Sequence, residues 1–250
     1  MILSKKLKKY NFISHGFFGS RGGISDGIYK SLNCGFGSND KDNKVRDNIK
    51  LVSKKIGCQS NKIIFNNQIH SKKIFFFKKK FKKRLKGDGS LTRTKGVALA
   101  VLTADCAPVI FLDIKKKIIG VAHAGWKGAL KGIIKNMVSC FVNNGSSKKD
   151  IIAAIGPTID KKSYEVKHDF KKKFLKKNLK NKKFFVRKKT KIFFHLQGYI
   201  VDQLNSAGID QVDVIKKDTF NIKNNLFSAR RSLKNGFNDY GRNISIIMIK

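Results

Sequence analysis

Cys106 and His123 are two residues of this chain whose types and spacing indicate chemistry. Cys106 lies in the segment TADCAP and His123 in the segment HAGWKG, beside two apolar runs separated by three lysines. These runs predict a β-hairpin with its turn near Lys116, which places His123 opposite Val109 and Cys106 just beyond the same end. Because Pro108 cannot donate to a ladder, a bend there would let the thiol and the imidazole converge.

A third donor is His70, in the segment NQIH at the end of its own predicted strand. One thiolate and two imidazoles, with a fourth position left for water, form the ligand set of a catalytic zinc site. Two other interpretations stay open. Cys106 could be a nucleophile with His123 as its base, or both could be ordinary buried residues. A Cys/His nucleophile pair needs no third donor, so His70 favours the metal site.

The elements that must position these residues are a mixture of helices and strands. Apolar residues at helical spacing predict an amphipathic helix from Val45 to Ile56 that stops at Gly57. Helices are also predicted over residues 130–141, 169–179 and 194–207, an exposed loop over 78–86, and strands over 62–70, 73–78, 97–103, 109–113, 118–122, 151–155, 184–186, 212–215 and 244–249. The first forty residues are rich in glycine and predict irregular structure.

The order of these elements indicates the fold class. Helices and strands do not alternate strictly, which favours an α+β fold over a doubly wound parallel sheet. No internal repeat or linker divides the 250 residues. The sequence therefore predicts a single α+β domain over residues 1–250, with mixed β-sheets flanked by helices.

The charge of the chain is extreme but evenly spread. There are 55 Lys and Arg residues against 16 Asp and Glu, a formal net charge of +39, which by itself points to nucleic acid or an anionic membrane as a partner. However, the lysine pairs and triplets run from Lys5 to Lys191, and only 8 of the basic residues are Arg. Because nucleic-acid readers depend on Arg for bidentate contacts, a solvated basic surface is the favoured interpretation, and nucleic acid is not the expected partner.

Cysteine usage and hydropathy predict a cytoplasmic protein without a membrane anchor. The four cysteines show no CxxC pair, and the basic N-terminus lacks the apolar stretch of a signal peptide. The longest apolar candidate, from Val97 to Ile114, contains Asp105, Pro108 and Asp113. It is too short and too polar for a membrane-spanning helix.

A set of ordered sequence blocks resembles a known family. The blocks are HGFF, RGGIS and SLN near the start, then QIH, DGSLT, TADCAPV, HAGWKG, IGP with YEV, and FSARR followed by Gly241-Arg242. Together they closely resemble the zinc-dependent purine nucleoside phosphorylases formerly named laccase-domain or multicopper polyphenol oxidoreductases. The resemblance implies that His70, Cys106 and His123 hold the metal, with Cys106 and His123 also serving in catalysis.

The activities implied by this resemblance are phosphorolysis of adenosine, inosine and 5′-methylthioadenosine, and adenosine deamination. The expected partners are thus a nucleoside and phosphate, for a monomer or a homodimer. Phosphorolysis needs a cationic phosphate site, and four of the eight arginines, Arg21, Arg230, Arg231 and Arg242, lie in matching blocks. Of these, Arg21 and Arg231 are predicted to bind the phosphate. The usual HxE and PCxxC deaminase signature is absent, and Ala229 stands where the family usually has Tyr.

Other functions remain as alternatives. Bacterial members of the family are also credited with editing peptidoglycan precursors by hydrolysis, and the basic charge allows a non-catalytic nucleic-acid-binding protein. The older copper oxidase name requires a mononuclear copper site and a trinuclear cluster with many imidazole ligands. The chain has only 5 His residues, too few for such a set.

Overall fold

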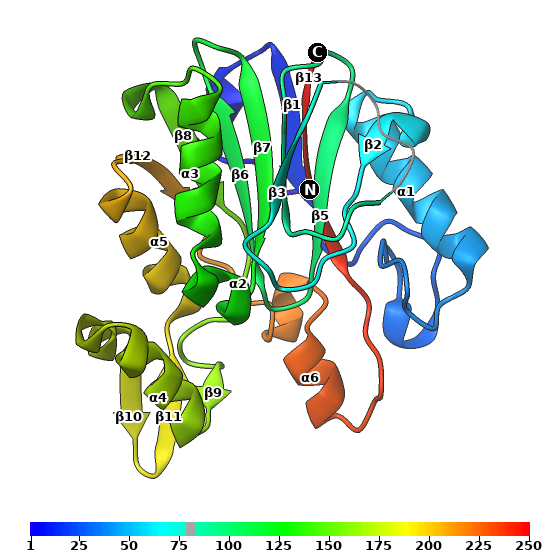
Figure 1. The fold of residues 1–250 in the computed structure, drawn as a ribbon. Coiled ribbons are helices and arrows are strands. Elements are labelled where there is room, and N and C mark those ends of the chain that lie inside the picture. Colours follow the sequence, from blue (N-terminus) through cyan, green and yellow to red (C-terminus); the bar gives the residue numbers. More distant parts are fainter. Residues whose placement is uncertain (79–83) are drawn as a thin grey trace.

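Two β-sheets pack face to face between layers of helices in the computed structural model, which describes residues 1–78 and 84–250. The six-stranded sheet has the order β12-β8-β6-β7-β4-β3 and the four-stranded sheet the order β1-β13-β5-β2. A small three-stranded sheet, β10-β11-β9, lies with α4 at the lower end of the molecule (Figure 1). The strands are β1 (Ile13–Phe17), β2 (Ile63–Ile64), β3 (Ile74–Phe77), β4 (Gly89–Thr92), β5 (Ala98–Thr103), β6 (Ala107–Asp113), β7 (Ile118–Ala124), β8 (Ile151–Ile155), β9 (Glu165–Val166), β10 (Phe185–Lys188), β11 (Lys191–Phe194), β12 (Gln211–Val214) and β13 (Asn243–Ile249).

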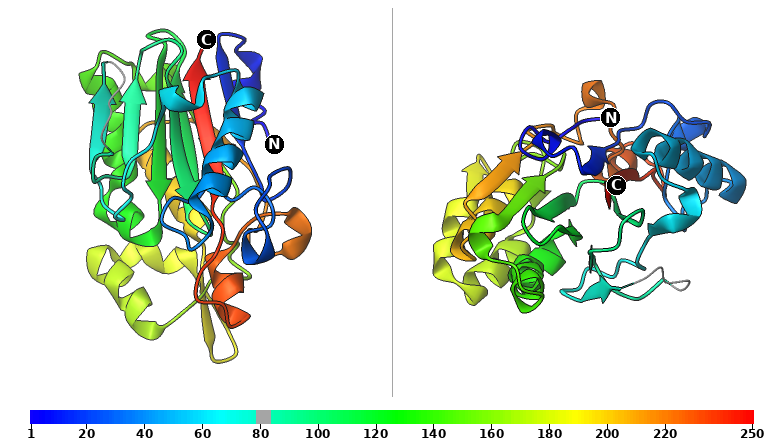
Figure 2. Two further views of the ribbon diagram at one scale, coloured as in Figure 1. Left: turned by 90° about the vertical axis from the view of Figure 1, so that its right-hand side faces the viewer. Right: turned by 90° about the horizontal axis from the view of Figure 1, so that it is seen from above.

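Helices cover the outer face of each large sheet. Seen from above in Figure 2, α1 lies at one side of the two sheets, and α3 and α5 lie at the other. The α-helices are α1 (Asp42–Ile56), α2 (Trp126–Lys131), α3 (Ile133–Asn143), α4 (His168–Lys177), α5 (Leu196–Ser206) and α6 (Ala229–Lys234). Short 3-10 helices span Leu7–Lys9, Gly27–Tyr29, Ser60–Lys62, Lys148–Asp150, Leu179–Phe184 and Ile222–Asn224.

The continuous apolar run of β6 follows from its central place in these layers. Val109 and Phe111 pack into the core beneath α3 and α5, whereas Ile110 and Leu112 pack into the core between the sheets. All four side chains are fully buried. A strand buried on both faces loses the alternation of polar and apolar residues, which explains why the sequence shows a run and no period of two.

The predicted α+β fold with mixed sheets flanked by helices is confirmed, as is the helix that ends at Gly57. The predicted helix over 130–141 is two helices, α2 and α3, because Gly132 adopts a left-handed φ of +91° between them. The long strand predicted over 62–70 is wrong beyond β2, and β1 lies within the predicted irregular start. Part of the predicted loop over 78–86 falls outside the described residues. Within the described part of the chain, no helix is long and apolar enough to span a membrane.

The predicted hairpin exists, but its register differs by one residue. His123 pairs with Pro108, not with Val109, because β6 and β7 are joined by the four residues from Ile114 to Lys117. A shift of one residue exchanges the two faces of a strand. His123 therefore lies nearer to Cys106 along the chain of β6 than the sequence predicts.

Candidate metal centre

His70, Cys106 and His123 come together at the lower end of the sheets, although they lie on three separate segments. His123 is near the end of β7, Cys106 immediately precedes β6, and His70 lies between β2 and β3. One ligand atom from each residue can be chosen so that the three atoms lie within 4.8 Å of one another. The structure thus brings together the three donors that the sequence predicts.

The space between these donors fits a metal ion. Nδ1 of His70 is buried and has no hydrogen-bond partner, which is costly for an imidazole nitrogen unless another group binds it. A β-carbon added at Gly125 would lie 2.7 Å from both Nδ1 of His70 and Sγ of Cys106. Glycine at this position therefore keeps the approach between thiol and imidazole open.

The carboxylate of Asp88 accepts hydrogen bonds from both histidines and holds them in position. Its Oδ1 accepts a hydrogen bond from Nδ1 of His123 at 2.8 Å and from the backbone N–H of His70 at 3.0 Å. Its Oδ2 accepts from the N–H and hydroxyl of Ser71, at 2.6 and 2.7 Å. A carboxylate that holds one ring nitrogen leaves the other nitrogen of His123 for a ligand.

The pKa values of this cluster reflect burial and mutual charge. Burial lowers the pKa of His70 to about 4, so its ring is neutral at physiological pH. Burial also acts to lower the pKa of His123, but its interactions with Cys106 and Asp88 outweigh burial and raise that pKa to about 9. Burial opposes ionisation of Asp88, yet hydrogen bonds from His123 and Ser71 lower its pKa to about 2. The raised pKa of His123 and the lowered pKa of Asp88 thus favour a protonated imidazole beside an ionised carboxylate at neutral pH.

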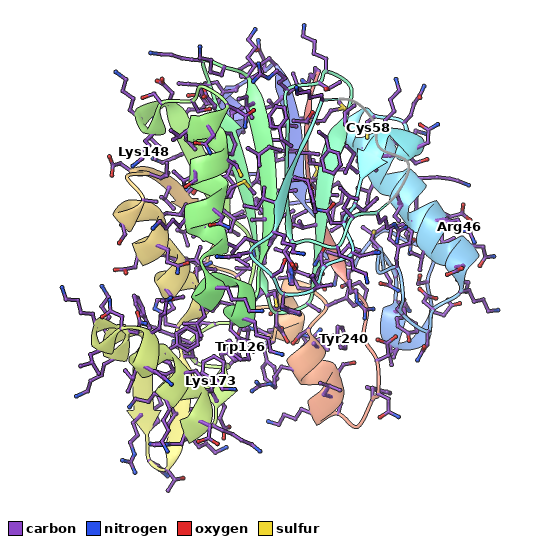
Figure 3. The ribbon with its side chains drawn as sticks, in the orientation of Figure 1. Arg46, Cys58, Trp126, Lys148, Lys173 and Tyr240 are labelled. Atoms are coloured by element: carbon purple, nitrogen blue, oxygen red, sulfur yellow. The ribbon has the colours of Figure 1, made fainter. Side chains whose placement is uncertain are left out.

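The donors open into a polar cavity of about 380 Å³. Arg84 and Arg242 contribute guanidinium groups, which lie 3.5 Å from the ring centre of Phe36 and 4.8 Å from that of Tyr240. Tyr240 lies below the ends of the sheets in Figure 3. The lining residues are Phe36, Asn66, Asn67, Gln68, His70, Arg84, Leu102, Thr103, Ala104, Cys106, His123, Tyr240 and Arg242.

Neither arginine predicted to bind phosphate lines this cavity. Arg21 is exposed on the glycine-rich loop that follows β1. The guanidinium of Arg231 donates instead to three backbone carbonyls, those of Thr219 at 2.6 Å, Phe220 at 3.0 Å and Leu226 at 2.5 Å. This arrangement ties the loop before α6 together.

Sequence reasoning missed the roles of Asp88 and Arg84. Asp88 lies in the DGSLT block, and a carboxylate directly before a buried strand is unusual in a chain with only 16 acidic residues. That rarity was the available signal. Arg84 is one arginine within a lysine-dense stretch, so its type did not stand out.

Comparisons with known proteins match the chain to a family model and to named relatives. A family model described as multi-copper polyphenol oxidoreductase laccase matches residues 14–250. A purine nucleoside phosphorylase of Rickettsia prowazekii is 36% identical over 191 residues, which cover 76% of this chain and 78% of the relative. The purine nucleoside phosphorylase YfiH of Escherichia coli is 29% identical over 215 residues, 86% of this chain and 87% of the relative.

Solved structures show the same fold. The hypothetical protein YfiH of Bacillus licheniformis superposes with a TM-score of 0.89 at 30% identity, covering 97% of this chain and 95% of the other. A Neisseria meningitidis protein gives a TM-score of 0.86 at 27% identity and covers 96% of each chain. The chain therefore belongs to the family described as multi-copper polyphenol oxidoreductase laccase, in which these sequence relatives bear the name purine nucleoside phosphorylase.

Proposed function

We propose that this chain is a zinc-dependent purine nucleoside phosphorylase that acts on adenosine, inosine and 5′-methylthioadenosine. The observation that carries the proposal is the convergence of His70, Cys106 and His123 on a cavity that also holds two arginines. The names of the relatives from Rickettsia prowazekii and Escherichia coli support it. The substrates are the nucleoside and inorganic phosphate.

The donor set favours zinc over copper. Two imidazoles and one thiolate with an open position suit catalytic zinc, whereas a blue-copper site with the same three ligands usually adds an axial Met. The described residues that line the cavity include no Met. The 5 His residues of the chain also exclude a trinuclear copper cluster beside a mononuclear site. When bound, zinc would supply a Lewis acid at the inner end of the cavity.

Arg84 and Arg242 are the groups that we assign to phosphate. Burial lowers the pKa of Arg84, and no acidic side chain among the described residues forms an ion pair with it. Arg242 is 3.6 Å from Asp239 and donates to the carbonyl of Tyr240 at 3.1 Å, which fixes its position. The attraction between a guanidinium and an anion is stronger when the guanidinium is partly buried than when it is exposed, because the effective dielectric constant is lower away from water.

In this proposal, the residues at the cavity have separate roles in the reaction. In phosphorolysis a phosphate oxygen forms a bond to C1′ of the ribose, the C1′–N9 bond breaks, and the base leaves with the bonding electron pair. The two arginines would hold the dianion in place and Asp88 would keep His123 oriented. The products are the free base, which takes up a proton, and ribose 1-phosphate, or 5-methylthioribose 1-phosphate when the substrate is 5′-methylthioadenosine.

Phosphorolysis is better supported than adenosine deamination. Zinc deaminases use a carboxylate to shuttle the proton of the attacking water. The described residues that line the cavity include no Asp or Glu. We therefore assign the cavity to glycosidic-bond cleavage.

The test combines metal analysis with base release from adenosine and inosine at increasing phosphate concentrations. Purified protein should contain one zinc per chain, and base release should depend on phosphate. Cys106→Ala should lose zinc and turnover together while the fold persists, because a core of this size does not depend on a metal. Cys140→Ala is the matched control, since Cys140 is also partly exposed but does not line the cavity.

Each other outcome identifies a different function. Zinc retained by Cys106→Ala would contradict the ligand assignment, and retained zinc with lost turnover would favour a cysteine nucleophile. Base release without phosphate would indicate hydrolysis, including an editing hydrolase. If nucleic acid is bound with an affinity that falls steeply with salt, and no nucleoside is turned over, the chain is a nucleic-acid-binding protein.

A further inference from the structure

Two residues at the candidate metal centre have a backbone conformation that is unfavourable for any residue with a β-carbon. His70 has φ +54°, and Asp105, the residue directly before Cys106, has φ +86°. Such conformations persist only where the surrounding contacts hold them, and they cluster at functional sites. Each of these two loop residues therefore needs a contact that holds it.

Asp105 is held by four hydrogen bonds from segments far away in the sequence. Its Oδ1 accepts from the hydroxyl of Thr219, and its Oδ2 from the backbone N–H of Arg230, both at 2.6 Å. Its carbonyl oxygen accepts from the hydroxyl of Thr158 at 2.6 Å and from the N–H of Ile159 at 3.1 Å. The turn between β5 and β6 is thus fastened to the segment after β8, to the loop after β12 and to the start of α6.

The arrangement parallels that of Asp88 at the other loop ligand. Asp88 accepts hydrogen bonds from the N–H groups of Ile69, His70 and Ser71 and so holds the left-handed conformation of His70. The fully buried carboxylate of Asp88 therefore fixes the backbone at His70, and the partly buried carboxylate of Asp105 fixes the backbone immediately before Cys106. The distant contacts are not needed merely to turn the chain after β5, because a glycine at position 105 would adopt the same left-handed φ without them.

We propose that Asp105 is a positioning residue for the Cys106 thiolate. By holding φ of residue 105 in the left-handed region, it sets the direction of the chain at Cys106 and aims Sγ at the two histidines. It touches neither the metal nor the substrate. The inference rests on the proposed zinc site, and it also makes the start of α6 part of the support of that site through the N–H of Arg230.

Variants at residue 105 separate the carboxylate from the backbone conformation. Asp105→Ala removes the carboxylate and keeps the penalty for a positive φ, whereas Asp105→Gly removes both. Thr219→Val removes one hydrogen bond and leaves residue 105 unchanged. Asp218→Asn is the matched control, because Asp218 accepts from Asp160, Ser163 and Phe220 in the neighbouring loops without adjoining a ligand.

The measurements are the zinc dissociation constant, from competition with a chromophoric chelator, and the thiolate-to-cobalt charge-transfer band of the Co²⁺-loaded protein. We expect Asp105→Ala to weaken zinc binding by about 10–100-fold, as other outer partners of metal ligands do, and to alter the band. Asp105→Gly should weaken binding less. Thr219→Val should weaken zinc binding several-fold. If Asp105→Ala does not fold, the zinc affinity of Thr219→Val tests the role of Asp105 in its place. Asp218→Asn should stay within about twofold of the unchanged protein.

Several results would overturn the proposal. One is an unchanged zinc affinity in Asp105→Ala, and another is an equal loss of zinc affinity in Asp105→Ala and Asp105→Gly. A third is a loss of zinc affinity in Asp218→Asn as large as that in Asp105→Ala, which would indicate a general effect of loop stability. If the unchanged protein binds no zinc, the proposed function fails and this inference fails with it. Zinc binding and phosphorolysis in the unchanged protein, with normal zinc affinity in the variants, would overturn this inference alone.

Discussion

Asp88 and His123 are hydrogen-bonded to each other twice, once through their backbones and once through their side chains. The N–H of His123 donates to the carbonyl of Asp88 at 2.7 Å, and Nδ1 of its ring lies 2.8 Å from the carboxylate. Asp88 is fully buried, and the side chain of His123 is 5% exposed. The pair therefore fixes both the position and the ring orientation of His123, so that its Nε2 is the nitrogen available to a metal.

Replacement of Asp88 should weaken metal binding more than it harms the fold. In Asp88→Asn, an amide N–H₂ replaces one of the two oxygens that now accept hydrogen bonds, so either His123 or the Ser71 N–H loses its acceptor. We expect the zinc dissociation constant to rise about 10–100-fold. Competition with a chelator measures it, and Ser71→Ala, which removes only one donor from the carboxylate, is the control with a smaller expected effect. Equal zinc affinities in Asp88→Asn and the unchanged protein would contradict the role given to Asp88.

Gly125 offers a steric test of the metal centre that leaves the ligands in place. Its φ of −70° is allowed for any residue, so Gly125→Ala introduces no backbone strain. The new methyl group would nevertheless lie 2.7 Å from Sγ of Cys106 and from Nδ1 of His70. We predict that the variant folds with a lowered thermal midpoint in chelator, because shifting the two side chains costs about 1–3 kcal/mol, and that it binds zinc at least tenfold more weakly. Normal zinc content by elemental analysis would show that the ligands converge elsewhere.

The sequence predicted the fold class and the convergence of Cys106 and His123 because both follow from local patterns, whereas His70 was proposed as a third donor from its residue type alone. Cys106 and His123 flank one hairpin, so strand geometry alone brought them to the same end. The one-residue error in register came from the length of the turn after Ile114, which the three lysines do not define. Gly132 was hidden within a helical pattern, since a glycine in a helix is not rare enough to predict a break.

The residues that complete the site depend on contacts between distant segments, which periodicity does not reveal. Asp88 reaches His70 and His123 through the packing of β4 against β7. Arg84 and Arg242 meet at the cavity from positions 158 residues apart, as their numbers show. Block matching selected Arg231 because its segment is distinctive, and the structure shows that its guanidinium binds backbone carbonyls.

Substitutions of arginines should separate phosphate binding from loop stability. Arg242→Lys loses the planar fork that can hold two phosphate oxygens, so we expect the KM for phosphate to rise about tenfold with unchanged zinc content. Arg231→Lys should instead lower the free energy of unfolding by about 2 kcal/mol, because an ammonium cannot satisfy three separate carbonyls. Phosphate titrations of base release and urea unfolding measure the two effects. A raised KM for phosphate in Arg231→Lys, without a lower free energy of unfolding, would show that Arg231 binds phosphate after all.

The environment of His15, away from the metal centre, predicts a pH dependence of the free energy of unfolding. It lies in β1, is 5% exposed, and its Nε2 accepts a hydrogen bond from the backbone N–H of Ser4 at 3.0 Å. Only the neutral ring can accept this bond. Burial lowers the pKa of His15 to about 4, an effect that the charge of nearby Asp213 reduces but does not cancel.

The sign of the effect follows from this lowered pKa. The unfolded chain takes up a proton near the ordinary pKa of 6.5, whereas the folded chain does so only near 4. The contribution of neutral His15 is therefore fully present above pH 6.5 and is lost as the pH falls from 6.5 to about 4. A difference of this size corresponds to roughly 3 kcal/mol.

The measurement is the free energy of unfolding in urea between pH 4 and pH 7, with a chelator present so that zinc release does not contribute. His15→Gln keeps an acceptor near the Ser4 N–H but does not titrate, so its stability should fall less steeply over this range. Subtracting one profile from the other isolates His15 from His70 and His195, whose pKa values are also lowered by burial. If the two profiles are parallel, His15 is not the neutral acceptor that the geometry requires.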